Sequence, residues 1–143
     1  MVIYGDGELR EDLQKIINNL DLENCVSMPG SKKDIHEKIK SAEMFVLSSR
    51  YEGYPNALIE AMAIGMPVIS TNCKYGPEEI IKNNVNGFLV ETGDFCELSN
   101  VMEIIVNNKK LSKEISYNAM LIRDRLDSSK ITDKWLELIF KIT

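Results

Sequence analysis

Two glutamates, Glu52 and Glu60, mark the part of this sequence with the clearest chemical character. The surrounding segment reads SSRYEGYPNALIEAMAIGMPVIS over residues 48–70, and seven residues separate the two acids. Glu60 stands inside the apolar run Ala-Leu-Ile-Glu-Ala-Met-Ala-Ile. An acid inside an apolar run raises the question of what it does there, and this makes Glu60 the first candidate for a binding role.

Pro55 suits the first turn of a helix, where its missing N–H costs no hydrogen bond. The start of that helix is expected to leave backbone N–H groups free, and the glycine in the preceding turn lets a ligand come close to the backbone. Free amides and the positive end of the helix dipole favour a phosphate or diphosphate. The residues predicted to supply these amides are Gly53, Tyr54, Asn56, Ala57 and Leu58.

Glu60 and Asn56 are four residues apart and therefore share a face of the predicted helix. A carboxylate about one turn beyond a diphosphate site is placed to accept two hydrogen bonds from a vicinal diol such as that of ribose. Glu52, before the helix, lies where a sugar beyond the diphosphate would be. Two simpler explanations stay open at this point: a solvated surface glutamate, or an acid that favours the helix dipole.

Strands and helices alternate along the rest of the chain, which predicts an α/β fold with a doubly wound parallel sheet. The segment from Leu9 to Leu20 has apolar residues at helical spacing, and a helix is predicted from about Asp34 to Ser41. The helix after Pro55 is expected to end near Gly65. Strands are predicted at residues 1–4, 25–30, 44–49, 67–70 and 87–90, a short helix near 77–83, and two or three helices from Phe95 to Ile142.

The last predicted helix has a clean apolar stripe. Two interpretations stay open: the stripe covers the core of this domain, or it packs partly on a second domain. The residues of the stripe are Ile131, Trp135, Leu138, Ile139 and Ile142.

Composition narrows the classes of function. With 143 residues, the chain is long enough for one domain with a core of its own, and 44% hydrophobic with 27% charged residues is ordinary for a globular protein. A net charge of −5 disfavours a nucleic-acid partner. The three cysteines Cys25, Cys73 and Cys96 fit no disulfide or metal spacing, which predicts reduced thiols in the cytoplasm. His36, the single histidine, lies in the charged segment KKDIHEKIK, where a solvated helix face is the expected role.

The segment SRYEGYPNALIEAMAIGMPVIST closely resembles the donor-site signature of the family 4 retaining glycosyltransferases, which have the GT-B fold of two Rossmann-like domains. The segments VIYGDGELREDLQKIINNL, VSMPGSKKDIHEKIKSAEMFVLSS and YGPEEIIKNNVNGFLVETGD extend the resemblance over about residues 2 to 107. It implies that residues 1–143 are the C-terminal, nucleotide-sugar-binding domain of such an enzyme.

The resemblance also implies a role for each matching residue. Glu52 would be catalytic, touching the donor sugar hydroxyls and supporting the reacting centre. The five amides at residues 53, 54 and 56–58 would hold the diphosphate, and Glu60 would bind the ribose hydroxyls. The turn formed by Pro29, Gly30 and Ser31 resembles the base-contacting loop of the family. Gly76-Pro77 matches a later turn less well, because Tyr75 stands where a second glycine is common, and no role beyond structure is expected there.

Two parts of the family pattern are not matched, so we expect a fold truncated at its N-terminus. A strand and helix that carry an arginine and a lysine for the leaving diphosphate would precede Met1, as would the acceptor-binding domain. The chain by itself is therefore expected to be inactive, with membrane contact only through the other domain.

The reaction implied by the resemblance transfers a glycosyl group from a nucleotide diphosphate sugar to an acceptor hydroxyl with retention. The donor would be a UDP-, GDP- or ADP-sugar, and no metal or other cofactor is expected; the sequence has no Asp-x-Asp pair. Polysaccharide assembly is the process implied by analogy. Two alternatives stay open: an enzyme like the nucleotide-sugar 2-epimerases, which share the architecture, and a non-catalytic nucleotide-binding module.

Overall fold

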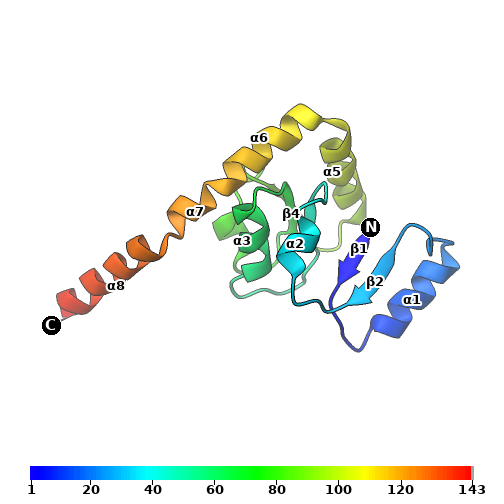
Figure 1. The fold of residues 1–143 in the computed structure, drawn as a ribbon, viewed down its shortest axis with the longest axis horizontal. Coiled ribbons are helices and arrows are strands. Elements are labelled where there is room, and N and C mark those ends of the chain that lie inside the picture. Colours follow the sequence, from blue (N-terminus) through cyan, green and yellow to red (C-terminus); the bar gives the residue numbers. More distant parts are fainter. Residues whose placement is uncertain (143) are drawn as a thin grey trace. The chain divides into compact units, whose positions relative to one another are not determined.

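The computed structural model describes residues 1–142, with side chains for residues 1–141. Its strands are β1 (Val2–Tyr4), β2 (Ser27–Gly30), β3 (Phe45–Leu47), β4 (Val68–Thr71) and β5 (Phe88–Val90) (Figure 1). Its helices are α1 (Arg10–Asn19), α2 (Ile35–Ile39), α3 (Asn56–Ala63), α4 (Pro77–Ile80), α5 (Phe95–Asn107), α6 (Lys109–Met120), α7 (Ile122–Arg125) and α8 (Ser128–Ile142). Among these residues every strand pairing is parallel, so the predicted α/β class with parallel strands is confirmed.

The chain divides into two compact units, Met1–Ile35 and the residues from His36 onward. In the first unit, β1 and β2 pair in parallel, with α1 between them in the chain. Arg10 joins the turn after β1 to the end of β2, because its guanidinium donates to the carbonyl of Met28 and lies 3.7 Å from the Asp6 carboxylate. Arg10 therefore has a structural role within this unit.

In the second unit, β3, β4 and β5 form a parallel sheet in that order. All four residues of the central strand β4 are buried, as expected for a parallel strand covered on both faces. α3 packs against β3 and β4, while α5 packs against β4 and β5 (Figure 1). The sheet thus delivers the segment after β3 to its carboxyl edge, where ligands of such folds bind.

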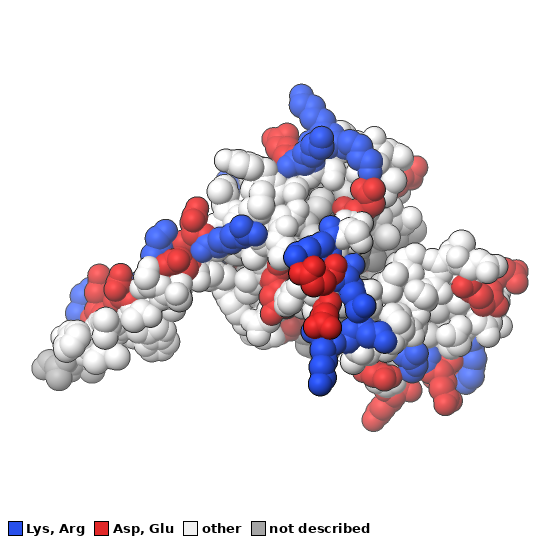
Figure 2. Space-filling model, viewed as in Figure 1, with Lys and Arg blue, Asp and Glu red and all other residues white. Residues whose placement is uncertain are grey.

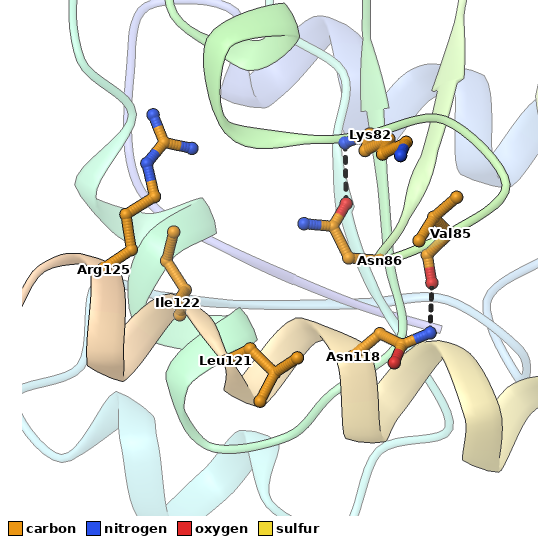
Figure 3. Close-up of a pocket in the computed structure, with 7 residues that line it drawn as sticks. All are labelled: Lys82, Val85, Asn86, Asn118, Leu121, Ile122 and Arg125. Atoms are coloured by element: carbon orange, nitrogen blue, oxygen red, sulfur yellow. Dashed lines mark hydrogen bonds between the residues drawn. The ribbon is translucent and has the colours of Figure 1, made fainter.

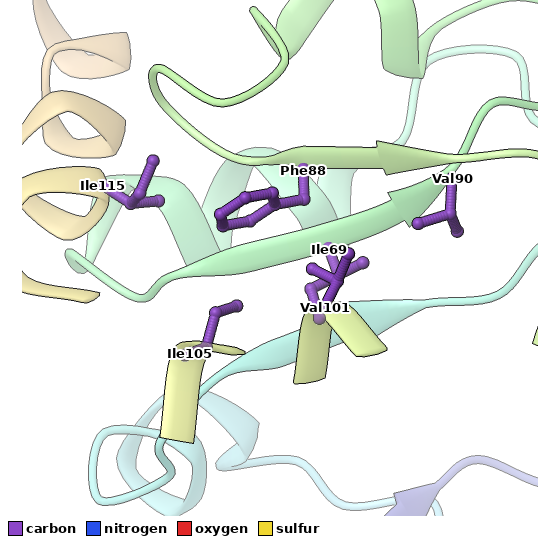
Figure 4. Packing of buried hydrophobic residues seen from close by; sticks show 6 residues of the cluster. All are labelled: Ile69, Phe88, Val90, Val101, Ile105 and Ile115. Atoms are coloured by element: carbon purple, nitrogen blue, oxygen red, sulfur yellow. The ribbon is translucent and has the colours of Figure 1, made fainter. Parts of the chain in front are cut away.

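The core of the second unit lies between this sheet and the helices α5 and α6 (Figure 4). Ile69 from β4 and Ile105 from α5 have no exposed surface, and Ile115 from α6 has 1%. Phe88, Val90 and Val101 complete the buried cluster. This packing holds the strands that carry the candidate site.

Within the described residues, the segment from Phe95 to Ile142 forms four helices where two or three were predicted. The additional boundaries come from local capping and short turns. Asn108 ends α5 and caps α6, because its side chain accepts a hydrogen bond of 3.0 Å from the Leu111 amide. Asp94 caps α5 in the same way, accepting from the Glu97 amide at 2.8 Å.

Replacing Asp94 with alanine is expected to lower the free energy of unfolding by about 1 kcal/mol, since the Glu97 amide loses its acceptor. Urea unfolding monitored by circular dichroism measures the change. Asp94→Asn keeps an acceptor oxygen and serves as the control. Equal stability of the alanine variant and the wild type would show that this cap contributes nothing.

α8 exposes much of its predicted apolar stripe. Trp135 is 61% exposed, Leu138 50% and Ile139 55%, whereas Ile131 is partly buried. The side chain of Ile142 lies outside the described residues. The interpretation that this stripe covers the core of its own unit is therefore wrong for its exposed members.

Acidic and basic side chains lie interspersed on the face that Figure 2 shows, without a broad region of one sign. None of the helices in residues 1–142 combines the length and apolar character that crossing a membrane requires.

Candidate functional site

The first component of the candidate site is the segment that follows β3. Glu52 is partly buried there, and its carboxylate accepts a hydrogen bond of 2.6 Å from the Ser49 hydroxyl. Thr71, buried at the end of β4, donates its own hydroxyl to the Ser49 carbonyl. The end of the central strand thus holds the backbone at Ser49, and Ser49 in turn orients Glu52.

The loop that follows β4 supports the turn that precedes α3. Tyr51 and Lys74 form an isolated parallel bridge that extends the pairing of β3 with β4. Gly76 then approaches the turn so closely that a Cβ atom at this position would lie 2.8 Å from the Gly53 carbonyl oxygen and 2.8 Å from Cδ of Pro55. The expected structural role of Gly76 is therefore specific: it allows two backbone segments to pack at the start of α3.

The start of α3 has most of the free backbone amides that the sequence predicts. Among the described residues, the N–H groups of Gly53, Tyr54, Asn56 and Ala57 have no backbone hydrogen-bond partner. Leu58 differs from the prediction, because its N–H donates to the Pro55 carbonyl at 3.1 Å and the residue is fully buried. Four amides rather than five are thus available to an anion at this end of the helix.

Glu60 lies on the exposed face of α3, as its four-residue spacing from Asn56 predicts. The opposite face is buried through Leu58, Ala61 and Met62. The side chain of Glu60 keeps 51% of its surface exposed, and its Oε2 lies 3.8 Å from Nε2 of His36 on α2. The predicted solvated helix face is thus only part of the role of His36, since its ring also reaches a candidate ligand-binding carboxylate.

Pro29, Gly30 and Ser31 belong to the first unit, at the end of β2. Gly30 has a φ of +77°, and its carbonyl accepts a hydrogen bond from the Gly5 amide at 3.4 Å. The loop is therefore held against the turn that follows β1. Its predicted contact with a nucleobase stays a prediction.

A shallow cavity of about 220 Å3 lies elsewhere in the second unit, between the loop before β5 and the helices α6 and α7 (Figure 3). The side-chain amides of two lining residues already have partners. That of Asn118 donates to the Val85 carbonyl at 2.9 Å, and that of Asn86 accepts from the backbone N–H of Lys82 at 2.7 Å. These bonds join the loop to the helices. We therefore interpret this hollow as a structural junction.

Sequence reasoning missed Ser49 and His36 as partners of the two glutamates, and Thr71 as the partner of Ser49. Ser49 and Thr71 are polar residues at the carboxyl ends of adjacent strands, which is a signal that the sequence contains. His36 had no such signal, because its approach to Glu60 depends on how α2 packs.

Comparison with known proteins gives a consistent result. The model of the family described as glycosyl transferases group 1 matches residues 1–121. A UDP-Gal:alpha-D-GlcNAc-diphosphoundecaprenol alpha-1,3-galactosyltransferase of Escherichia coli is 32% identical, over 96% of this chain and 37% of its own length. A poly(ribitol-phosphate) alpha-N-acetylglucosaminyltransferase of Staphylococcus aureus is 31% identical, over 95% of this chain and 28% of its own length.

Among solved structures, HepE of Anabaena in complex with UDP-glucose superposes with a TM-score of 0.89 at 27% identity, covering 98% of this chain and 40% of that protein. The chain thus spans less than half the length of the relatives named here, and it corresponds to the C-terminal part of GT-B glycosyltransferases.

Proposed function

Because this chain belongs to the group 1 glycosyltransferases, we propose that it binds the donor of a retaining glycosyl transfer, a nucleotide diphosphate sugar. One observation carries the proposal: four amides at the start of α3, without a hydrogen-bond partner among the described residues, lie about one turn before the exposed carboxylate of Glu60. Amides of this kind favour a diphosphate, and the carboxylate favours the two hydroxyls of a ribose. Residues 1–143 would act as one nucleotide-sugar-binding domain.

In the proposed reaction, the bond between the anomeric carbon and the diphosphate breaks, and the diphosphate leaves with the electron pair. The oxygen of the acceptor hydroxyl forms the new bond on the same face of the sugar, and its proton passes to the leaving diphosphate. The amides of Gly53, Tyr54, Asn56 and Ala57 would stabilise the charge that develops on the diphosphate. Glu52, oriented by Ser49, would contact the sugar hydroxyls.

The donor is proposed to be a UDP-sugar, because UDP-glucose is the ligand of the similar HepE protein. The nucleobase would meet the loop of Pro29, Gly30 and Ser31. We propose that no metal ion is needed, since backbone amides and basic side chains would neutralise the diphosphate. An acceptor-binding domain of the longer enzyme would complete the site. We propose that the enzyme works in the cytoplasm.

Glu60→Gln is expected to weaken UDP binding at least tenfold, because charge-assisted hydrogen bonds contribute about 1.5–3 kcal/mol each. NMR shift mapping with UDP, GDP and ADP measures the affinity and identifies the preferred base. Wild-type shifts should concentrate at residues 29–31 and 53–60.

Glu114→Gln is the matched control for this substitution. It removes the same charge from an exposed position on α6 and should leave UDP binding unchanged. The absence of wild-type shifts at millimolar nucleotide would count against the proposal, as would equal weakening by both variants.

A further inference from the structure

His36 and Glu60 come from different helices of the second unit and meet at the proposed ribose site. Nε2 of His36 lies 3.8 Å from Oε2 of Glu60, and the two side chains are 49% and 51% exposed. This separation is within the range of an ion pair when the imidazole is protonated. The contact is a product of packing, since 24 positions separate the two residues in the sequence.

The partner of His36 from another helix is Glu60, since the acidic neighbour of His36 on its own helix pairs with a lysine. Glu37, beside His36 on α2, is occupied by Lys40: the Lys40 ammonium donates a hydrogen bond to its carboxylate and, with a smaller contribution from His36, lowers the pKa of Glu37. Glu60 has no other ion-pair partner among the described residues.

We propose that His36 is a positioning residue for Glu60 in donor binding, which rests on the function proposed above. A half-exposed glutamate has several rotamers of similar energy, and ordering it for a ligand costs conformational entropy. An imidazolium beside Oε2 favours the rotamers that keep the carboxylate near α2, and leaves the lone pairs of Oε1 for the ribose hydroxyls.

The expected effect is modest, because exposed ion pairs contribute little. We expect protonation of His36 to strengthen donor binding by about two- to fivefold, which corresponds to the upper part of the range for such pairs. Histidine side chains change charge between pH 5 and 8, whereas carboxylates ordinarily stay ionised above pH 5.5. A pH profile of donor binding therefore reports on the imidazole.

The test is titration of the chain with UDP-glucose between pH 5.5 and pH 8, monitored by NMR. UDP-glucose is the suitable probe because its diphosphate, esterified at both ends, keeps a constant charge over this range. Wild-type affinity should rise two- to fivefold from pH 8 to pH 5.5. His36→Gln should bind with the weaker, pH-independent affinity, and His36→Arg, positive throughout, should bind tightly at both limits.

Lys40→Gln provides the matched control, because it removes a positive charge from the same helix but from a side chain that contacts Glu37. It should keep the wild-type pH response. In a Glu60→Gln background, His36→Gln should have no further effect, since its partner is already gone.

The outcomes separate the two proposals. If the wild type does not bind UDP-glucose, the proposed function fails and this inference falls with it. If the wild type binds and His36→Gln keeps both its affinity and its pH response, donor binding stands and the role of His36 is overturned.

Discussion

Replacing Gly76 with alanine is expected to lower the free energy of unfolding by about 2–5 kcal/mol and to weaken nucleotide binding. Gly76 has a φ of +92°, which non-glycine residues rarely adopt, and an added Cβ would meet the Gly53 carbonyl oxygen at 2.8 Å. Because that neighbour is backbone, the turn that carries the amides of Gly53 and Tyr54 has to move. Urea unfolding and UDP titration of the same variant measure the two effects.

Gly93 offers a matched control for Gly76. Its φ is also +92°, but no atom lies within 4 Å of an added Cβ. Gly93→Ala should therefore cost only the backbone strain, about 1–2 kcal/mol, and leave UDP affinity unchanged. Equal destabilisation by the two variants would mean that the contact with the turn has no energetic weight.

The second large effect is expected in the core. Ile105→Ala should lower the free energy of unfolding by about 2–5 kcal/mol, because a fully buried side chain leaves a cavity against Ile69 and Ile115. Thermal and urea unfolding measure the loss. Since the site lies at the edge of the same sheet, the variant should bind UDP normally where it remains folded.

Ile104, the neighbour of Ile105 on α5, is the corresponding control. It is 45% exposed, so truncation to alanine removes little buried surface and should cost less than about 1.5 kcal/mol. A loss for Ile104→Ala as large as that for Ile105→Ala would contradict the assignment of the core.

Local sequence was enough to predict most of the elements. Pro55 and Gly65 bracket α3 because proline favours a helix start and Gly65 takes a φ of +82° just after its end. The number of helices after Phe95 differed from the prediction for a reason that is also local. Asn108 caps a new helix, so this segment is divided into more helices than periodicity alone indicates. For α8, periodicity predicted an amphipathic helix but not the exposure of its apolar stripe.

In the candidate site, too, part of the geometry could be predicted from the local sequence and part could not. Glu60 and the start of α3 follow from spacing, since residues four apart on a helix share a face whatever the helix packs against. The amide of Leu58 was predicted to be free, but the first turn closes with a 3.1 Å bond to the Pro55 carbonyl. This detail of geometry at a helix start is not encoded in the residue types.

The sequence by itself determined the α/β class, the family resemblance and the order of the donor-site residues, because each depends on periodicity or on neighbours within one or two turns. Three contacts were decided only by the tertiary structure. Thr71 donates a hydrogen bond to the Ser49 carbonyl, and Gly76 packs closely against the carbonyl of Gly53. The ring of His36 lies near the carboxylate of Glu60. These contacts join residues more than 20 positions apart. Their formation depends on how the strands pair and how α2 packs, which no local pattern specifies.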